Sequence, residues 1–122
     1  LWDGILIKEN HIAAAGGIAA ALAAARTLGA SVAVQIEVEN LAELDQALAA
    51  GATSVLLDDF TLADMQRAYR VNDGRALLEV SGGVDLDSVR DIARSGVDRI
   101  SVGKLTKDVR AVDLSMRIGD AA

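Results

Sequence analysis

The amino-acid sequence predicts an α/β fold in which strand–helix units repeat around a parallel sheet, and three observations support this prediction. Glycines recur at intervals of 22 or 23 residues, at Gly29, Gly51, Gly74 and Gly96. Apolar residues at helical spacing precede these glycines, and a short apolar run follows each of them. A glycine in that place is typical of a helix C-terminus, where the chain needs a positive φ before it enters the next strand.

The predicted strands are short segments rich in β-branched residues and leucine. They cover residues 5–8, 32–38, 54–58, 76–80 and 99–102. In the third segment, Val55, Leu56 and Leu57 are apolar on both faces. Strands of a parallel sheet have this composition because helices or other elements cover both of their faces.

The predicted helices show single apolar stripes, as helices that pack on a sheet do. The stripes are Ile18, Leu22 and Ala25; Leu41, Leu44 and Leu48; Leu62, Met65 and Tyr69; and Leu86, Val89 and Ala93. Asn40, Thr61 and Asp85 precede three of these stripes and are residue types that cap helix N-termini. A further helix is expected at residues 107–116, after Gly103.

Length and composition limit the possible architectures and functions. A closed eight-stranded barrel takes about 250 residues, so the 122 residues here predict either a doubly wound sheet or a segment of a barrel. The formal net charge of −6 and the scarcity of aromatic residues argue against nucleic-acid binding. The absence of cysteine excludes a disulfide scaffold, and no apolar run is long enough for a membrane span. Because the sequence begins at Leu1 without a methionine, we expect it to be a piece of a longer chain.

Polar or glycine-rich groups stand at the carboxyl end of every predicted strand. They are Lys8 to His11, Glu37 to Asn40, Asp58 and Asp59, Ser81 to Gly83, and Gly103 with Lys104. Both candidate architectures bind ligands at this edge of the sheet. The sequence therefore predicts a binding site there.

The second predicted strand carries polar residues with a period of two. Gln35, Glu37 and Glu39 alternate with apolar residues, which places all three on one face. One interpretation is an edge strand with a solvated face. The other is a polar barrel interior in which Glu37 meets a metal ion or substrate hydroxyls, because a carboxylate in an apolar interior needs a partner.

The glycine-rich turn predicts a phosphate site. Two glycines let the backbone of Ser81, Gly82 and Gly83 approach a phosphate closely, and Gly103 one unit later is placed for the same corner. Glu37 and Asp58 are suited to Mg²⁺, which takes one or two carboxylates together with substrate oxygens.

Two further residues are candidates with competing interpretations. Lys8 is suited to neutralise an anionic substrate. His11 is the only histidine, so it cannot form a multi-histidine metal site, and it is equally suited to cap the helix that follows it.

At these residues the sequence closely resembles the quinolinate phosphoribosyltransferase family. The resemblance rests on the motifs LIKENHIAAAGG (6–17), IEVENL (36–41), LDDF (57–60), LEVSGGV (78–84) and GVDRISVGKLT (96–106). It implies the C-terminal part of a TIM-like (β/α) barrel domain over residues 1–122, with the N-terminal domain and the first barrel strands absent. It also implies transfer of phosphoribose from phosphoribosyl pyrophosphate to quinolinate with decarboxylation, in the cytoplasm and in NAD biosynthesis.

The resemblance implies a role for each site residue. It makes Lys8 an anion-binding lysine and places Glu37 and Asp58 near the ribose hydroxyls and Mg²⁺. The resemblance also places a phosphate at Ser81, Gly82, Gly83 and Gly103, with His11 and Lys104 as further possible site residues. It also implies a homo-oligomer that is a dimer or is built from dimers. In the family, arginines of the N-terminal domain and of the earlier barrel strands grip quinolinate, so without them we expect these residues alone to be an inactive part of the enzyme.

Other interpretations remain open at this point. A paralogous phosphoribosyltransferase-like protein linked to molybdenum transport would share the barrel and the phosphate corner but use another base. A receiver-type signalling domain also has five strand–helix units, and Asp58, Ser81 and Lys104 meet its coarse template. It would need an acidic pair after the first strand, where Lys8 stands instead.

Overall fold

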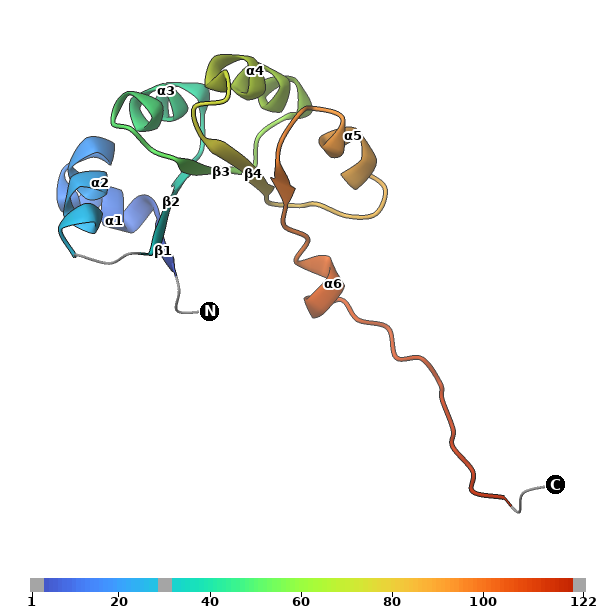
Figure 1. Ribbon diagram of the computed structural model, residues 1–122. Helices are drawn as coiled ribbons and strands as arrows, with labels where there is room; N and C mark the ends of the chain where they lie inside the picture. Colours follow the sequence, from blue (N-terminus) through green and yellow to red (C-terminus); the bar gives the residue numbers. More distant parts are fainter. Residues whose placement is uncertain (1–3, 29–31, 120–122) are drawn as a thin grey trace.

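The centre of the molecule is a sheet of five parallel strands (Figure 1). The computed structural model describes residues 4–28 and 32–119. Its strands are β1 Gly4–Ile7, β2 Ala33–Val38, β3 Ser54–Asp58, β4 Leu77–Ser81 and β5 Arg99–Ile100. Each strand begins and ends within two residues of a predicted segment, so the prediction of repeated strand–helix units is confirmed.

The strand order decides between the two architectures that the sequence left open. A doubly wound sheet reverses its order near the middle, as in 2-1-3-4-5. Here each strand pairs in parallel with the next one along the chain, from β1 to β5. The strands form an arc with helices on its convex side (Figure 1), which is how consecutive units of a (β/α) barrel are arranged. The doubly wound and receiver-type alternatives are therefore wrong.

Helices follow each strand in the described part of the chain. They are α1 Glu9–Ala15, α2 Ile18–Thr27, α3 Leu41–Ala49, α4 Leu62–Asn72, α5 Val89–Ala93 and α6 Lys104–Lys107. Asn40 and Thr61 are N-caps as predicted, since their side chains accept hydrogen bonds from backbone N–H groups at 3.0 and 3.2 Å. Within residues 4–28 and 32–119, no helix has the length and apolar character that crossing a membrane requires.

The glycines at the helix ends have the predicted conformation. Gly51, Gly74 and Gly96 adopt φ values of 78°, 72° and 98°, while Gly29 lies outside the described residues. At Gly96 the space is also restricted, because a Cβ there would stand 2.7 Å from the ring of Tyr69. This position therefore requires glycine both for its backbone angle and for its packing.

The two faces of the sheet differ in composition because neighbouring residues of a strand point to opposite sides. The convex face packs against the helices and supplies the most deeply buried side chains. These are Ile36, Val38, Val55, Leu57, Leu78 and Val80, each at most 1% exposed. The concave face carries the alternate residues, among them Gln35, Glu37 and Glu79.

The prediction of a helix at residues 107–116 is wrong. Helix α6 ends at Lys107, and residues 108–119 have no regular element and lead away from the arc (Figure 1). Apolar residues alternate with polar ones from Val112 to Ile118, and these two side chains are 76% and 95% exposed. A period of two leaves no apolar stripe along a helix, so helix formation would bury no continuous face.

The helix expected from Leu86 also begins later, at Val89. The Asp85 carboxylate accepts hydrogen bonds from the N–H groups of Asp87 and Ser88, at 3.2 and 3.0 Å. Asp85 thus caps the turn before α5 rather than the helix itself. Leu86 belongs to this turn and is 78% exposed, so it is not part of the packed stripe.

Candidate functional site at the carboxyl ends of the strands

An ion pair joins the ends of β1 and β2. The Lys8 ammonium lies 3.1 Å from the Glu37 carboxylate, which is buried to 7% exposure. The hydrogen bond and the charge of Glu37 raise the pKa of Lys8 above its ordinary value. A buried carboxylate is costly without a partner, and Lys8 supplies one. The pair also holds a positive charge at the carboxyl ends of β1 and β2.

The position of β2 settles how its polar residues are to be interpreted. This strand lies between β1 and β3, so the edge-strand interpretation is wrong and Gln35 and Glu37 face the concave interior. There the Gln35 amide donates to the Glu79 carboxylate at 3.0 Å, and the Ser101 hydroxyl donates to the same carboxylate at 2.5 Å. Contact between side chains of β2 and β4 across β3 is the layered packing of a (β/α) barrel interior.

Glu79 is a residue that the sequence reasoning missed as part of the interior network. Its signal was available, because Glu79 and Ser81 alternate with Leu78 and Val80. This is the same period of two that marked Glu37 in β2. Glu79 was overlooked because its apolar neighbours, Leu78 and Val80, are typical of a strand that is buried on both faces.

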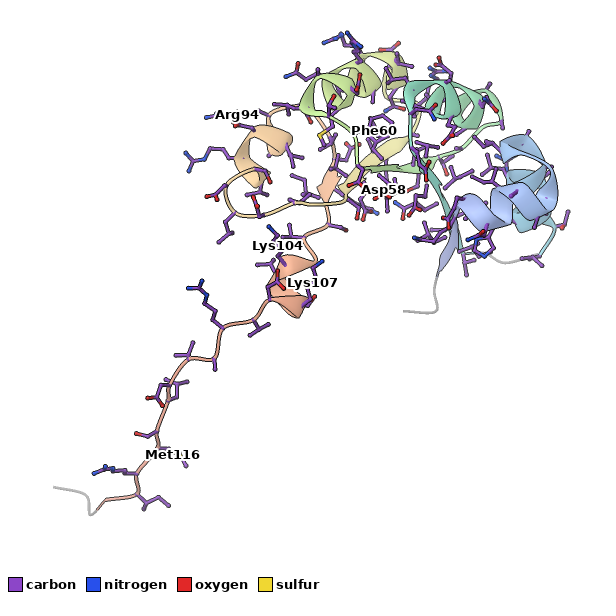
Figure 2. All side chains as sticks on the ribbon, turned by 180° about the vertical axis from the view of Figure 1, so that it is seen from behind. Asp58, Phe60, Arg94, Lys104, Lys107 and Met116 are labelled. Atoms are coloured by element: carbon purple, nitrogen blue, oxygen red, sulfur yellow. The ribbon has the colours of Figure 1, made fainter. Side chains whose placement is uncertain are left out.

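Asp58 ends β3 in register with Ser81 at the end of β4. Its carboxylate makes no hydrogen bond or ion pair with any residue of the described part of the chain. Figure 2 shows Asp58 on the concave side of the arc, away from the helices. The carboxylate is therefore available to a cation or to hydroxyl groups of a ligand.

The glycine-rich turn after β4 packs tightly against the end of β3. Gly82 has a φ of 89°, and a Cβ there would stand 2.2 Å from the Asp59 carboxylate and 2.9 Å from its backbone nitrogen. Only glycine fits this close approach. The N–H groups of Gly82 and Gly83 donate to no acceptor of the described residues, so they are free to bind an anion.

The structure brings this turn together with the loop after β5, as predicted. A cavity of about 210 Å³ lies between them, lined by Ser81, Gly82, Gly83, Val84, Ser101, Gly103, Lys104 and Lys107. We call it the phosphate corner. Its backbone groups and lysines are the residue types that bind phosphate.

The two lysines of the phosphate corner lie on α6 (Figure 2) and differ in their partners. Lys104 donates to the Asp85 carboxylate at 2.9 Å, and this hydrogen bond, with those from Ser88, holds the pKa of Asp85 well below its usual range. Lys107 pairs with no carboxylate of the described residues. The sequence reasoning missed Lys107 because it assigned the residue to a helix that does not form.

His11 caps the helix that follows it, which is one of the two roles that the sequence left open. Its Nδ1 accepts a hydrogen bond from the backbone N–H of Lys8 at 3.0 Å, in the first turn of α1. The imidazole therefore stabilises the helix start that directly follows the lysine. Its second nitrogen makes no hydrogen bond to the described residues.

The donors at this edge suit a hard divalent cation bound partly by a ligand. In the part of the chain that the structure describes, no group of three His, Cys, Asp or Glu residues is placed to hold a metal ion. Glu37 and Asp58 offer two carboxylates, and Mg²⁺ is usually held by one or two together with substrate phosphates. The residues thus fit Mg²⁺ that arrives with a phosphorylated substrate.

Fold and site together define a class: a segment of a (β/α) barrel with charged and glycine-rich groups gathered at the carboxyl ends of its strands. Comparison with known proteins then gives the family. Residues 1–117 match the family described as quinolinate phosphoribosyl transferase, C-terminal domain. The chain belongs to this family.

Individual relatives agree with this assignment. The carboxylating nicotinate-nucleotide pyrophosphorylase of Mycobacterium leprae is 40% identical over 95% of this chain and 42% of its own length. The solved structure of the nicotinate-nucleotide pyrophosphorylase from Francisella tularensis is 50% identical, with a TM-score of 0.89 over 94% of this chain and 41% of that one. The thiamine phosphate pyrophosphorylase of Pyrococcus furiosus, at 19% identity and a TM-score of 0.65, shares the fold. The chain spans about 40% of the length of the family relatives that it matches.

Proposed function

We propose that this chain supplies the phosphoribosyl-binding half of a quinolinate phosphoribosyltransferase active site. One observation carries the proposal. On a single edge of the sheet, the Lys8–Glu37 pair and the unpaired Asp58 carboxylate adjoin a phosphate corner that holds the unpaired Lys107. A substrate with phosphates at one end and a reacting sugar in the middle matches that order of groups.

The reaction breaks the bond between C1 of the ribose and the pyrophosphate oxygen and forms a bond from C1 to the ring nitrogen of quinolinate. Pyrophosphate leaves with the bonding electron pair. The carboxyl group next to the ring nitrogen then leaves as carbon dioxide, a proton takes its place, and nicotinate mononucleotide remains. Positive charge develops on the ribose as the pyrophosphate departs, so preorganised carboxylates lower the barrier.

Each site residue has a role in this scheme. Glu37 and Asp58 face the ribose, where they bind its hydroxyls and stabilise the developing positive charge. Lys8 binds an anionic group of the substrates and pairs with the Glu37 carboxylate. Ser81, Gly82, Gly83 and Gly103 bind a phosphate group of phosphoribosyl pyrophosphate through N–H and hydroxyl groups. No covalent nucleophile is required.

Glu37 and Asp58 are also the residues that would hold Mg²⁺. The concave face carries the carboxylates of Glu37, Asp58 and Glu79. In the described part of the chain only Glu37 among them forms an ion pair, with Lys8, so the negative charge there exceeds the positive charge and favours binding of a cation. When bound, Mg²⁺ would neutralise the pyrophosphate as it accumulates negative charge. We further propose a cytoplasmic homo-oligomer, dimeric or built from dimers, without a nucleic-acid or membrane partner.

The test is a chimera in which this chain replaces the matching segment of the Francisella tularensis protein. We expect it to form nicotinate mononucleotide from quinolinate and phosphoribosyl pyrophosphate, measured by chromatography. Glu37→Gln and Asp58→Asn should each lower kcat/KM about 100-fold or more, because they remove charge that acts in the transition state. The 122 residues alone should form no product.

The matched control is Glu39→Gln, which removes an exposed carboxylate two residues further along the same segment. Its kcat/KM should stay within about threefold of the parent, as surface changes usually have small effects. A folded chimera without turnover would contradict the proposed reaction. Equal losses at Glu37 and Glu39 would contradict the proposed site.

A further inference from the structure

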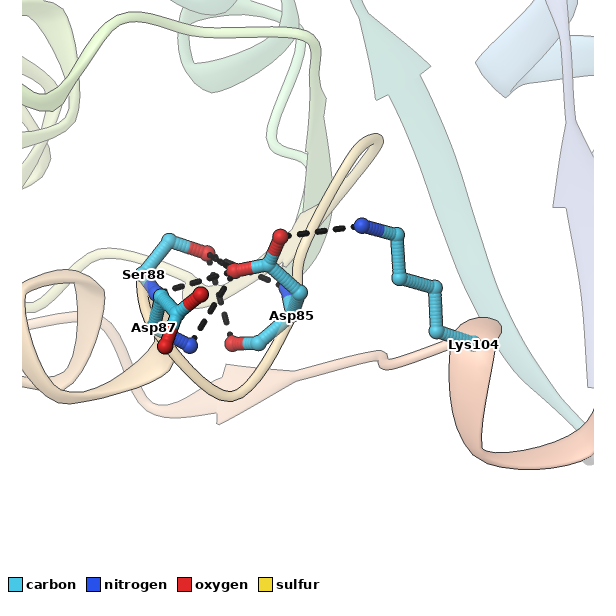
Figure 3. Close-up of polar contacts among 4 residues, drawn as sticks. All are labelled: Asp85, Asp87, Ser88 and Lys104. Carbon is cyan, nitrogen blue, oxygen red and sulfur yellow. Dashed lines mark hydrogen bonds and ion pairs between the residues drawn. The ribbon is translucent and has the colours of Figure 1, made fainter. Parts of the chain in front are cut away.

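The phosphate corner contains an internal competitor for one of its two lysines. Lys104 and Lys107 both line the cavity. Figure 3 shows the Lys104 ammonium directed at the Asp85 carboxylate, 2.9 Å away. Lys107 has no such partner in the described residues, so the two lysines present different net charges to an anion.

Asp85 is held in place by contacts that do not involve Lys104. Its Oδ1 accepts hydrogen bonds from the N–H groups of Asp87 and Ser88 and from the Ser88 hydroxyl, at 3.2, 3.0 and 3.0 Å. Its Oδ2 is the atom that faces Lys104. One oxygen therefore fixes the side chain on the turn before α5, and the other is presented to the lysine as a preorganised acceptor.

Lys104, in contrast, has a long side chain that is half exposed, at 47%. A lysine carries its charge on a flexible four-carbon stem, so its ammonium group can contact either the carboxylate or an anion in the cavity. These two contacts compete for the same positive charge. An anion that enters the corner meets Lys107 with its full charge and Lys104 with its charge largely cancelled.

We propose that Asp85 tunes the affinity of the phosphate corner by holding Lys104 away from the bound anion. The inference rests on the proposed function, in which the corner binds a phosphate or pyrophosphate group. Asp85 is then a positioning residue, since it acts through Lys104 and does not itself contact the anion. Because Asp85 holds Lys104 away, the corner binds the product more weakly, and a multiply charged anion such as pyrophosphate can leave.

The test measures binding of inorganic pyrophosphate to this chain by titration, followed in the ¹H–¹⁵N spectrum at the amides of Gly82, Gly83 and Gly103. Asp85→Asn keeps an oxygen that caps the turn but releases Lys104. We expect it to bind pyrophosphate about threefold more tightly, the size expected when one unit charge a few ångströms away is removed in water. Asp85→Ser also caps such a turn and serves if the asparagine variant does not fold.

A double-mutant cycle separates competition for Lys104 from the general field of the carboxylate. Lys104→Met keeps most of the stem and removes the charge. In that background, Asp85→Asn should give a smaller gain than in the parent, because no lysine remains to be released. Asp87→Asn is the matched control, since it removes the same charge two residues away without an ion pair to Lys104, and its effect should be smaller than that of Asp85→Asn.

Each outcome decides the question. Tighter binding by Asp85→Asn that depends on Lys104 supports the proposal. An equal gain in the parent and Lys104→Met backgrounds overturns the proposal, because the carboxylate then acts only through its electric field. Weaker binding by Asp85→Asn also overturns it, because the ion pair then serves to order the two loops that it joins. If the parent chain shows no pyrophosphate shifts at the three glycines, the proposed phosphate corner fails as well, which distinguishes that failure from the failure of this inference alone.

Discussion

The convex and concave faces of the same sheet are built on different principles. The helices of this chain cover the convex face, so Ile36, Leu57 and Leu78 are each at most 1% exposed. The concave face carries Glu37 and Glu79. Glu37 pairs with Lys8, directly after β1, and Glu79 accepts a hydrogen bond from Gln35 of β2. The packed core therefore lies on one face, and the polar side chains proposed to bind the substrate lie on the other. Alternation along each strand separates the two.

The largest expected effect on stability comes from two adjacent leucines of β3 that point to opposite faces. Leu57→Ala on the convex face should lower the free energy of unfolding by about 3 kcal/mol, because it leaves a cavity in a closely packed core. Leu56→Ala on the concave face should cost less, since Leu56 lies outside that core cluster. Urea unfolding followed by circular dichroism measures both losses, and equal losses would contradict the assignment of stability to the convex face.

A second test examines the packing of the helix layer through its glycines. Gly96→Ala should destabilise the fold by about 2 kcal/mol, since it combines a strained positive φ with a clash against the Tyr69 ring. Gly74→Ala is the matched control, because Gly74 has a similar φ of 72° but nothing within 4 Å of an added Cβ. It should cost about 1 kcal/mol from strain alone. If both variants lose the same stability, the contact with Tyr69 is not a constraint.

The smallest effect concerns the ion pair between Lys104 and Asp85, beside the phosphate corner. Since Lys104 and Ser88 hold the pKa of Asp85 below its usual range, Asp85 contributes stability at neutral pH that is lost as the pH falls below about 4. Asp85→Asn lacks this contribution, so its stability should fall less steeply than that of the parent under acid conditions. Urea midpoints at a series of pH values measure this, with Asp87→Asn expected to keep the steeper dependence. Parallel curves for Asp85→Asn and the parent would contradict the role of the pair.

Much of the site was predictable because it depends on local features. Ligands bind at the strand ends of parallel α/β folds, so Lys8, Glu37, Asp58 and the glycine turn were predicted as site residues from their positions. The structure places all of them at that edge of the sheet. Lys107 was missed because the helix was predicted at residues 107–116 instead of at α6. The role given to Lys104 was incomplete because its partner, Asp85, is 19 residues away in the sequence. Glu79 was missed because its partners, Gln35 and Ser101, are 44 and 22 residues away in the sequence.

The repeat of strands and helices and the caps at Asn40 and Thr61 could be predicted from the sequence. So could the gathering of polar and glycine-rich groups at one edge of the sheet. These follow from periodicity and from residue types, which act over a few neighbouring positions. The order of the strands around the arc and the polar interior that β2 faces were decided by the tertiary structure. Strand order and partner choice depend on contacts between distant segments, which a local pattern does not specify.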